Sequence, residues 1–238
     1  MAKIEKKLFS STNHYINILR LDRPIGIYLL LWPTLWSLWL TAEGRPSIKL
    51  LLVFVAGVVV MRSAGCVMND IADRNIDPFV ERTKNRPLAM GAMTVKQAWA
   101  LFAGLIAIAF YLVLQLNIKS MFFAIGGLSL TILYPFCKRL FVAPQLILGL
   151  AFSWGIPMVF AATNTAFSLA FYLLWLNTAL WIVLYDTFYA MVDQEDDVRL
   201  GVYSTAILFG SYIKLVVGLL QITIVCLLGL IGNFFNLG

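Results

Sequence analysis

The sequence predicts an all-α integral membrane protein, a multi-helix transmembrane bundle of about seven spans. Hydrophobic residues make up 61% of the 238 residues, charged residues only 13%, and the mean hydropathy is +0.86. A soluble domain usually carries about 25% charged residues, so this composition excludes an ordinary soluble domain. The apolar runs are long and do not alternate with polar residues, which indicates helices rather than the strands of a barrel.

Windows without charged residues mark the spans in order along the chain. They cover residues 24–42, 50–69, 97–118, 120–137, 140–185 and 215–238, and only Arg62 interrupts them. A membrane-spanning helix needs about 20 apolar residues, so the window 140–185 holds two crossings, with a break near Thr163 and Asn164. No low-complexity linker separates the windows, so we expect a single transmembrane domain over residues 1–238.

The basic residues predict the orientation in the membrane. With the N-terminus inside, only Arg45, Lys49 and Lys119 fall in outer segments, while Arg62 lies within a span. Cytoplasmic segments of membrane proteins carry an excess of Lys and Arg, so we expect a cytoplasmic N-terminus. Seven crossings then place the C-terminus outside. The polar start of the chain does not predict a cleaved signal peptide.

Acidic residues concentrate in two predicted inner loops, at about 70–94 and 186–210. Nine of the 12 lie there: Asp70, Asp73, Asp77, Glu81, Asp186, Asp193, Glu195, Asp196 and Asp197. A lone acidic loop is most often a solvated topology signal. Charge near a bilayer is costly, however, and two acidic sets on the same side of the membrane favour a chemical function.

The first acidic loop has the spacing of one helix face. Asn69, Asp73 and Asp77 are spaced i, i+4 and i+8, which brings their side chains to the same side of a helix. Pro78 disfavours helical geometry at the residue before it, so the helix is predicted to end at Asp77.

The second acidic loop repeats this arrangement. Asp186, Asp193 and Asp197 are spaced i, i+7 and i+11, again on one helix face, whereas Glu195 and Asp196 point elsewhere. Mg²⁺ prefers oxygen ligands and often shares them with substrate phosphates, so two facing sets predict a Mg²⁺ site.

Cations that suit a phosphate group follow the first loop. Arg82, Lys84 and Arg86 lie within five residues of one another and can neutralise the charge of a diphosphate. The three cysteines form no CxxC pattern or metal set and are expected to be small buried hydrophobic residues: Cys66, Cys137 and Cys226.

Together these motifs resemble the UbiA superfamily of membrane aromatic prenyltransferases. Asn69 to Asp77 has the form NDxxDxxxD, and Asp193 to Asp197 has the form DxxxD. Segments 22–26, 31–36, 81–88 and 185–193 resemble the branch of the family that acts on 4-hydroxybenzoate. The resemblance covers about residues 20–210, and the two Asp motifs in combination are highly specific.

The resemblance implies a bundle around a central cavity and a Mg²⁺-dependent prenyl transfer in a bacterial inner membrane, with the active-site loops in the cytoplasm. Polyprenyl diphosphate loses its diphosphate, which metal ions and cations stabilise. The ring of 4-hydroxybenzoate attacks the allylic carbocation ortho to its hydroxyl, a step of ubiquinone biosynthesis. A carboxylate or the departing diphosphate then removes the ring proton.

The resemblance also implies roles for particular residues. The implied metal ligands are Asn69, Asp73, Asp193 and Asp197, with Asp70 and Asp77 as supporting or shared ligands. The five aspartates among these six are expected to be catalytic. The implied substrate-binding residues include Arg82, Arg86 and Lys138 at the diphosphate, together with Asp186.

Arg62 is the candidate that binds the aromatic acceptor. It precedes Asn69 by seven residues, which is two helical turns, and so lies on much the same face. A snorkelling arginine is the alternative, but Arg62 lies well inside the span. We therefore expect it to face the cavity and to pair with the carboxylate of the substrate. Tyr134 either lines the same cavity or is an interfacial aromatic, and Arg23 is more readily a topology anchor.

The chain departs from the family pattern in two places. Family members usually have nine transmembrane helices, so this chain is expected to lack the final helical hairpin, and the wall of the prenyl tunnel is affected. Tyr203 stands where relatives tend to carry Lys or Arg, which removes one phosphate or loop contact.

Other functions stay open at the level of the sequence. Within the family the acceptor can be a naphthoate, haem, chlorophyllide or glycerol phosphate. CDP-alcohol phosphotransferases have Gly where this chain has Arg74, which disfavours them. A non-catalytic polyprenyl-lipid binding or transport protein would place its charges near mid-span rather than at one membrane face.

Overall fold

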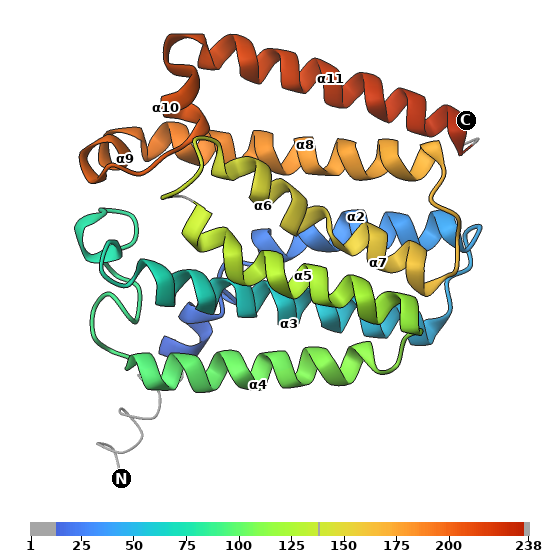
Figure 1. Ribbon diagram of the computed structural model, residues 1–238, viewed down its shortest axis with the longest axis horizontal. Helices are drawn as coiled ribbons and strands as arrows, with labels where there is room; N and C mark the ends of the chain where they lie inside the picture. Colours follow the sequence, from blue (N-terminus) through green and yellow to red (C-terminus); the bar gives the residue numbers. More distant parts are fainter. Residues whose placement is uncertain (1–12, 138, 236–238) are drawn as a thin grey trace.

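The computed structural model describes residues 13–137 and 139–235 of this membrane protein, and within these ranges it consists of helices and loops. The long helices run side by side between two ends of a bundle (Figure 1). A helical segment at residues 13–18 comes first. The elements that follow are α2 (Ile25–Thr41), α3 (Ile48–Asp73), η1 (Asp77–Phe79), α4 (Val95–Val113), α5 (Ile118–Cys137), α6 (Pro144–Ser153), α7 (Gly155–Ala162), α8 (Leu169–Val192), α9 (Gln194–Leu200), α10 (Thr205–Phe209), η2 (Gly210–Tyr212) and α11 (Ile213–Phe234).

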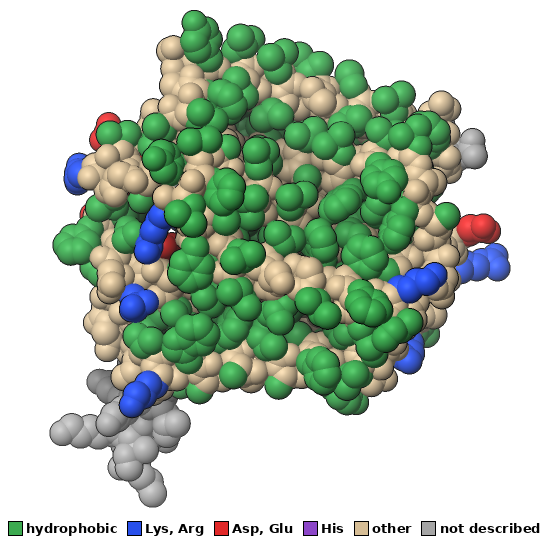
Figure 2. Space-filling view, in the orientation of Figure 1, with side chains coloured by type: hydrophobic (Ala, Val, Ile, Leu, Met, Phe, Trp, Pro, Cys, Tyr) green, Lys and Arg blue, Asp and Glu red, His purple; other side chains and the backbone are tan. Residues whose placement is uncertain are grey.

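The predicted crossings agree with these helices. In the described part of the chain, six units are long and apolar enough to span a membrane, and the shorter apolar helix α2 brings the total to seven. One of the six is α6 followed by α7, and the expected break after it lies at Asn164, whose φ is +53°. Hydrophobic side chains cover the middle of the molecule, and charged ones lie at the two ends of the helices (Figure 2).

Local chemistry explains where the helices begin and break. The hydroxyl of Ser47 accepts a hydrogen bond from the Leu50 amide at the start of α3, and Thr94 and Gln97 form a capping box at the start of α4. α6 and α7 are separated at Trp154, three residues before Pro157. Proline lacks the N–H that would bond to the preceding turn, which accounts for a break at this point.

Two expectations about helix ends are wrong. α3 ends at Asp73, so Asp77 lies in the separate 3-10 helix η1 and not on the same helix face as Asn69. α8 ends at Val192, and Asp193 lies between it and α9, so Asp186 and Asp197 belong to different helices. Turns rather than continuous helices therefore bring Asp73, Asp77, Asp193 and Asp197 to one recess.

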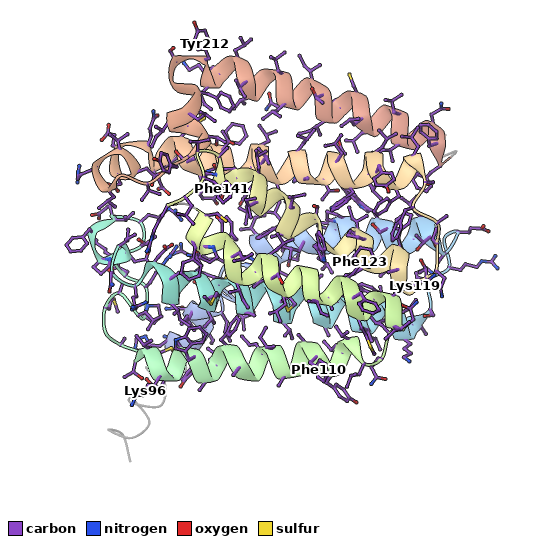
Figure 3. All side chains as sticks on the ribbon, viewed as in Figure 1. Lys96, Phe110, Lys119, Phe123, Phe141 and Tyr212 are labelled. Atoms are coloured by element: carbon purple, nitrogen blue, oxygen red, sulfur yellow. The ribbon has the colours of Figure 1, made fainter. Side chains whose placement is uncertain are left out.

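The two ends of the bundle carry different loops. η1 and α9 lie at one end, which is also the end of Lys96, whereas Lys119 lies at the other (Figures 1 and 3). This separation is the one that the distribution of basic residues predicted for the two sides of the membrane.

A close contact between α6 and α8 depends on Gly149. A Cβ atom at this position would lie 2.8 Å from the backbone oxygen of Ala179 and 2.9 Å from Cγ2 of Val183. Small residues allow membrane helices to approach closely, and here the nearest neighbour is backbone, which cannot rotate away.

We predict that Gly149→Ala lowers the free energy of unfolding by about 1–3 kcal/mol, because overpacking forces the helices apart. The apparent melting temperature of the purified protein in detergent measures this. Gly104→Ala on α4 is the matched control, since a Cβ there meets nothing within 4 Å. Equal melting temperatures for the two variants would contradict the role given to Gly149.

Candidate active site

Two acidic segments far apart in the chain meet at the same end of the bundle (Figure 1). One follows α3 and includes η1, and the other joins α8 to α9. Together they line a recess of about 110 Å³, here called the acidic recess. Its charged lining residues are Asp73, Asp77, Asp186, Asp193, Asp197, Arg82, Arg86 and Arg139.

Arg82 and Asp193 connect the two segments directly. Nε of Arg82 donates hydrogen bonds of 3.0 and 3.1 Å to the two carboxylate oxygens of Asp193, and Nη2 donates another to Oδ2. The guanidinium also lies over the Tyr189 ring, 5.7 Å from its centre. Burial lowers the pKa of Arg82, but its hydrogen bonds and charge attraction to Asp193 outweigh burial and leave that pKa raised.

A chain of ion pairs lies beside this contact. Nη1 of Arg86 is 2.9 Å from Oδ2 of Asp77 and 3.2 Å from Oδ1 of Asp70, and Nη2 of Arg20 is 2.8 Å from the same Asp70 oxygen. Asp70 is completely buried. Burial raises the pKa of Asp77, and the nearby Arg86 opposes that rise. A carboxylate in such a place needs cationic partners to stay ionised.

The recess suits a hard divalent cation by its donor chemistry. Carboxylate oxygens from both acidic segments face the same space, and these are the ligands that Mg²⁺ prefers. Within residues 13–137 and 139–235, no three Asp, Glu, His or Cys side chains are grouped so as to hold one ion. Arginines stand against these carboxylates instead, including Arg139, whose Nη2 is 3.7 Å from Oδ1 of Asp73.

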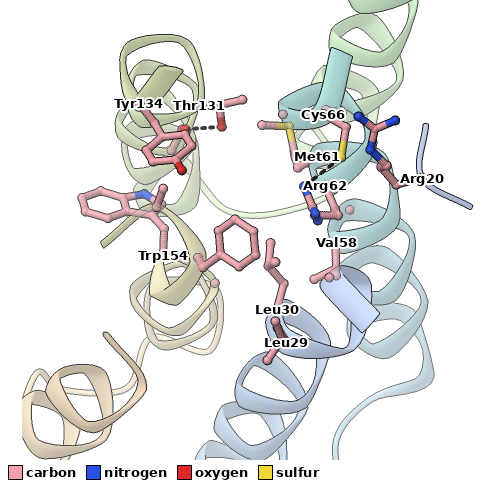
Figure 4. A pocket seen from close by; sticks show the side chains of 18 of the residues that line it. Arg20, Leu29, Leu30, Val58, Met61, Arg62, Cys66, Thr131, Tyr134 and Trp154 are labelled. Carbon is pink, nitrogen blue, oxygen red and sulfur yellow. Dashed lines mark hydrogen bonds between the residues drawn. The ribbon is translucent and has the colours of Figure 1, made fainter. Parts of the chain in front are cut away.

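A much larger cavity of about 780 Å³ continues from the acidic recess into the bundle. Among the described residues, five line both spaces: Arg82, Arg86, Tyr134, Asp186 and Tyr189. Deeper in, the lining becomes apolar, with Leu29 and Leu30 from α2 and Val58 and Met61 from α3 (Figure 4). The main cavity therefore joins a charged opening to a hydrophobic interior.

Arg62 lines the main cavity, as the sequence predicted (Figure 4). Its Nη1 donates to Sγ of Cys66 at 2.8 Å, and its guanidinium carbon lies 5.2 Å from the centre of the Phe152 ring. The snorkelling alternative is thereby disfavoured, because the side chain contacts cavity residues from α3 and α6.

The remaining predicted residues have the following places. Asn69, Asp70, Tyr134 and Asp186 line the main cavity. Lys138 lies outside the described residues. Arg23 is exposed and contacts its neighbour Asp22 at 3.5 Å, and it also contributes to the lining of the main cavity.

Two arginines of this site are not among the predicted residues. Arg20 pairs with Asp70, 50 residues away. Arg139 donates to the backbone oxygen of Ala72, 67 residues away. The signal in the sequence for such partners was indirect: aspartates expected near the membrane need cationic side chains beside them.

These features define a class: membrane proteins whose apolar cavity opens among carboxylates and arginines, suited to an amphiphile with an anionic head group. The chain belongs to the UbiA prenyltransferase family, whose model matches residues 30–238. It is 53% identical over 94% of its length to a 4-hydroxybenzoate octaprenyltransferase of Pseudomonas aeruginosa (strain LESB58), of which it covers 76%. It is 52% identical over 94% to that of Coxiella burnetii (strain CbuK_Q154), of which it covers 78%.

Solved structures share the fold. A UbiA homolog from Aeropyrum pernix K1 matches with a TM-score of 0.78 and 29% identity, covering 90% of this chain and 80% of that one. A UbiA homolog from Archaeoglobus fulgidus, bound to DMAPP and Mg²⁺, matches with a TM-score of 0.73 and 16% identity, covering 92% and 78%. The predicted family and helical membrane fold are confirmed.

The buried ion pair between Arg20 and Asp70 generates a prediction about stability. We expect Arg20→Met to lower the free energy of unfolding by roughly 1–3 kcal/mol, because the Asp70 carboxylate loses one of its two partners. Adding Asp70→Asn should recover part of that loss, since the remaining buried group is then neutral. Apparent melting temperatures of both single variants and the double variant measure the coupling.

Arg45→Met, an exposed arginine at the opposite end of the bundle, serves as the control and should leave the melting temperature unchanged. Strict additivity of the two single substitutions would contradict the pairing of Arg20 with Asp70.

Proposed function

We propose that this protein transfers a polyprenyl group from polyprenyl diphosphate to the ring of 4-hydroxybenzoate, ortho to the hydroxyl, in ubiquinone biosynthesis. The observation that carries the proposal is an acidic recess and an apolar cavity that share lining residues: carboxylates and arginines at the opening, an apolar interior, and Arg62 deeper on α3. These parts suit a diphosphate, a prenyl chain and an aromatic acid respectively. The 53% identity to a 4-hydroxybenzoate octaprenyltransferase supports the same assignment.

The acidic recess is the proposed site of the diphosphate. Asp73, Asp77, Asp193 and Asp197, which line the recess, would hold Mg²⁺ there together with Asn69 from the lining of the main cavity. Bound Mg²⁺ neutralises charge on the diphosphate and makes it a better leaving group. Arg86 lines both spaces and pairs with Asp77 and Asp70, and we propose that it also contacts the phosphate oxygens, with Lys138 as a further proposed contact.

Arg82 and Asp193 would exchange each other for new partners when the substrate binds. In this structure each neutralises the other across the two acidic segments. A diphosphate that arrives with a divalent cation offers a new partner to both, an anion for Arg82 and a cation for Asp193. Little unpaired charge is then exposed during the exchange, which keeps the cost near the membrane low.

The apolar part of the main cavity is the proposed place of the prenyl chain. Its walls include Phe54 on α3, Ala109 on α4 and Met121 on α5, and it extends to Leu116 near the turn between α4 and α5. That turn lies at the end of the bundle opposite the acidic segments (Figure 1). The cavity thus offers apolar contact along most of the bundle to a long hydrocarbon.

Arg62 is the proposed partner of the acceptor carboxylate. It lies seven residues before Asn69 on α3, which at 1.5 Å per residue places it roughly 10 Å deeper. An acceptor held there by its carboxylate can direct its hydroxyl-bearing ring toward the recess. The carbon–oxygen bond to the diphosphate breaks with its electron pair on the diphosphate, and the ring carbon ortho to the hydroxyl attacks the resulting allylic carbocation. A carboxylate of the recess, or the departing diphosphate, takes the ring proton.

The protein is a multi-pass membrane protein, and we assign it to a bacterial inner membrane with the acidic recess facing the cytoplasm. The excess of Lys and Arg at the recess end supports this orientation. The assignment gives the enzyme access to a soluble acceptor from the cytoplasm and to a lipid donor from the bilayer.

Loss of a carboxylate from either acidic segment should abolish transfer. We expect Asp73→Asn and Asp193→Asn each to reduce kcat by about 100-fold or more, because each removes a charge that the leaving group requires. Formation of labelled prenyl-4-hydroxybenzoate by membranes containing the protein measures this. Removal of divalent cation with EDTA should have the same effect, and added Mg²⁺ should restore the wild-type rate.

Glu195→Gln is the matched control for these variants, since Glu195 is exposed and lies outside the recess. Its rate should equal the wild-type rate. Full activity in both aspartate variants would refute the site. Faster prenylation of a naphthoate or another acceptor than of 4-hydroxybenzoate would refute the proposed acceptor.

Orientation can be tested with single added cysteines. Lys96→Cys should react with a membrane-impermeant maleimide only in inverted vesicles, and Lys119→Cys only in intact spheroplasts, because the two positions lie at opposite ends of the bundle (Figure 3). The parent protein, with its native Cys66, Cys137 and Cys226, gives the background. The reverse pattern would place the recess outside.

A further inference from the structure

The guanidinium of Arg62 sits among groups from three different helices. Sγ of Cys66, one turn further along α3, accepts its hydrogen bond at 2.8 Å. The ring of Phe152, from α6, lies under it at 5.2 Å from the ring centre. Gly26, in the first turn of α2, lies against its remaining edge. Here these three residues are called the arginine seat.

Gly26 is the tightest part of the arginine seat. A Cβ atom at this position would lie 2.4 Å from Nε, 2.5 Å from Nη2 and 2.8 Å from the guanidinium carbon of Arg62. Gly26 is not among the glycines with a positive φ, so its backbone conformation does not require glycine. Glycine is required instead because the Arg62 guanidinium occupies the space that a side chain would need.

The seat positions the guanidinium without neutralising it. A thiol is a weak hydrogen-bond acceptor, and an aromatic ring attracts a cation without removing its charge. Nε of Arg62 is buried and has no hydrogen-bond partner among the described residues. An unpaired buried donor is costly, and a bound carboxylate offers a far stronger partner than the thiol.

We infer that Gly26, Cys66 and Phe152 are positioning residues that fix the Arg62 guanidinium in the main cavity and thereby set the preference for acceptors that carry a carboxylate. The inference rests on the proposed function, because it takes 4-hydroxybenzoate as the acceptor. None of the three residues needs to touch the reacting atoms. They act through Arg62, so their effect falls on acceptor selection rather than on the diphosphate.

Gly26→Ala tests the inference most directly. The added methyl group must push the guanidinium aside, so we expect KM for 4-hydroxybenzoate to rise about tenfold or more. A change of this size is typical when a well-placed hydrogen bond between charged groups is lost. The preference for 4-hydroxybenzoate over its uncharged amide, 4-hydroxybenzamide, should fall by a similar factor. KM for polyprenyl diphosphate should stay at the wild-type value. Arg62→Met provides the reference for complete loss of the cation.

Gly149→Ala is the matched control for a disturbance of packing alone. It crowds a glycine between α6 and α8 that does not line the main cavity. We expect it to lower the melting temperature while leaving KM for 4-hydroxybenzoate and the acid-over-amide preference unchanged.

A second pair of variants keeps the test decisive if Gly26→Ala fails to fold. Cys66→Val removes the acceptor of the Arg62 hydrogen bond at similar volume, whereas Cys66→Ser keeps an acceptor. Cys66→Val should weaken equilibrium binding of labelled 4-hydroxybenzoate, a measurement that needs no turnover, and Cys66→Ser should restore it. Phe152→Leu should weaken binding in the same way by removing the ring.

The outcomes separate this inference from the proposed function. A wild-type protein that does not prenylate 4-hydroxybenzoate would overturn the proposed function. A wild-type protein that does so, together with wild-type acceptor KM and acid-over-amide preference in Gly26→Ala or wild-type acceptor binding in Cys66→Val, would overturn the role of the arginine seat.

Discussion

Pairing of charges at the edge of the lipid is the constraint on which this site depends. Asp70 is completely buried, and it remains tolerable because Arg20 and Arg86 stand beside it at 2.8 and 3.2 Å. Arg86 also forms an ion pair with Asp77 at 2.9 Å. An isolated carboxylate in such surroundings would lose several kcal/mol of solvation, so each acid in the recess needs a cation nearby.

The same pairs give the site its shape. The contact between Arg82 and Asp193 holds together two segments that are 111 residues apart in the chain. It lies at the opening where both the acidic recess and the main cavity are accessible. Arg62 differs from Arg82 and Arg86, which pair with carboxylates, since a thiol, a ring and a glycine surround its guanidinium. A cation that is fixed but not neutralised is suited to receive an anion from outside.

The sequence predicted the spans well because membrane burial restricts charge so strongly, and it also placed the acidic segments that meet at one end of the bundle. The break near Asn164 followed from the length of the uncharged window 140–185. The position of Arg62 in the cavity followed from its being a charged residue inside a span. Helix ends were harder to predict. The helical spacing of the acidic residues continues past the true ends of α3 and α8, so it does not reveal that Asp77 and Asp193 lie beyond them. The partners of Asp70 and the approach of Gly26 to Arg62 come from folding distant segments together, and no local pattern encodes them.

Both acidic segments are proposed to bind one diphosphate through shared divalent cations. A structure of the protein with Mn²⁺ and a non-reactive polyprenyl thiodiphosphate tests this, because anomalous scattering locates the metal. We expect Mn²⁺ between the Asp73–Asp77 segment and the Asp193–Asp197 segment, with Arg82 turned from Asp193 to the phosphate. Metal bound by one segment alone, with the pair between Arg82 and Asp193 intact, would contradict it.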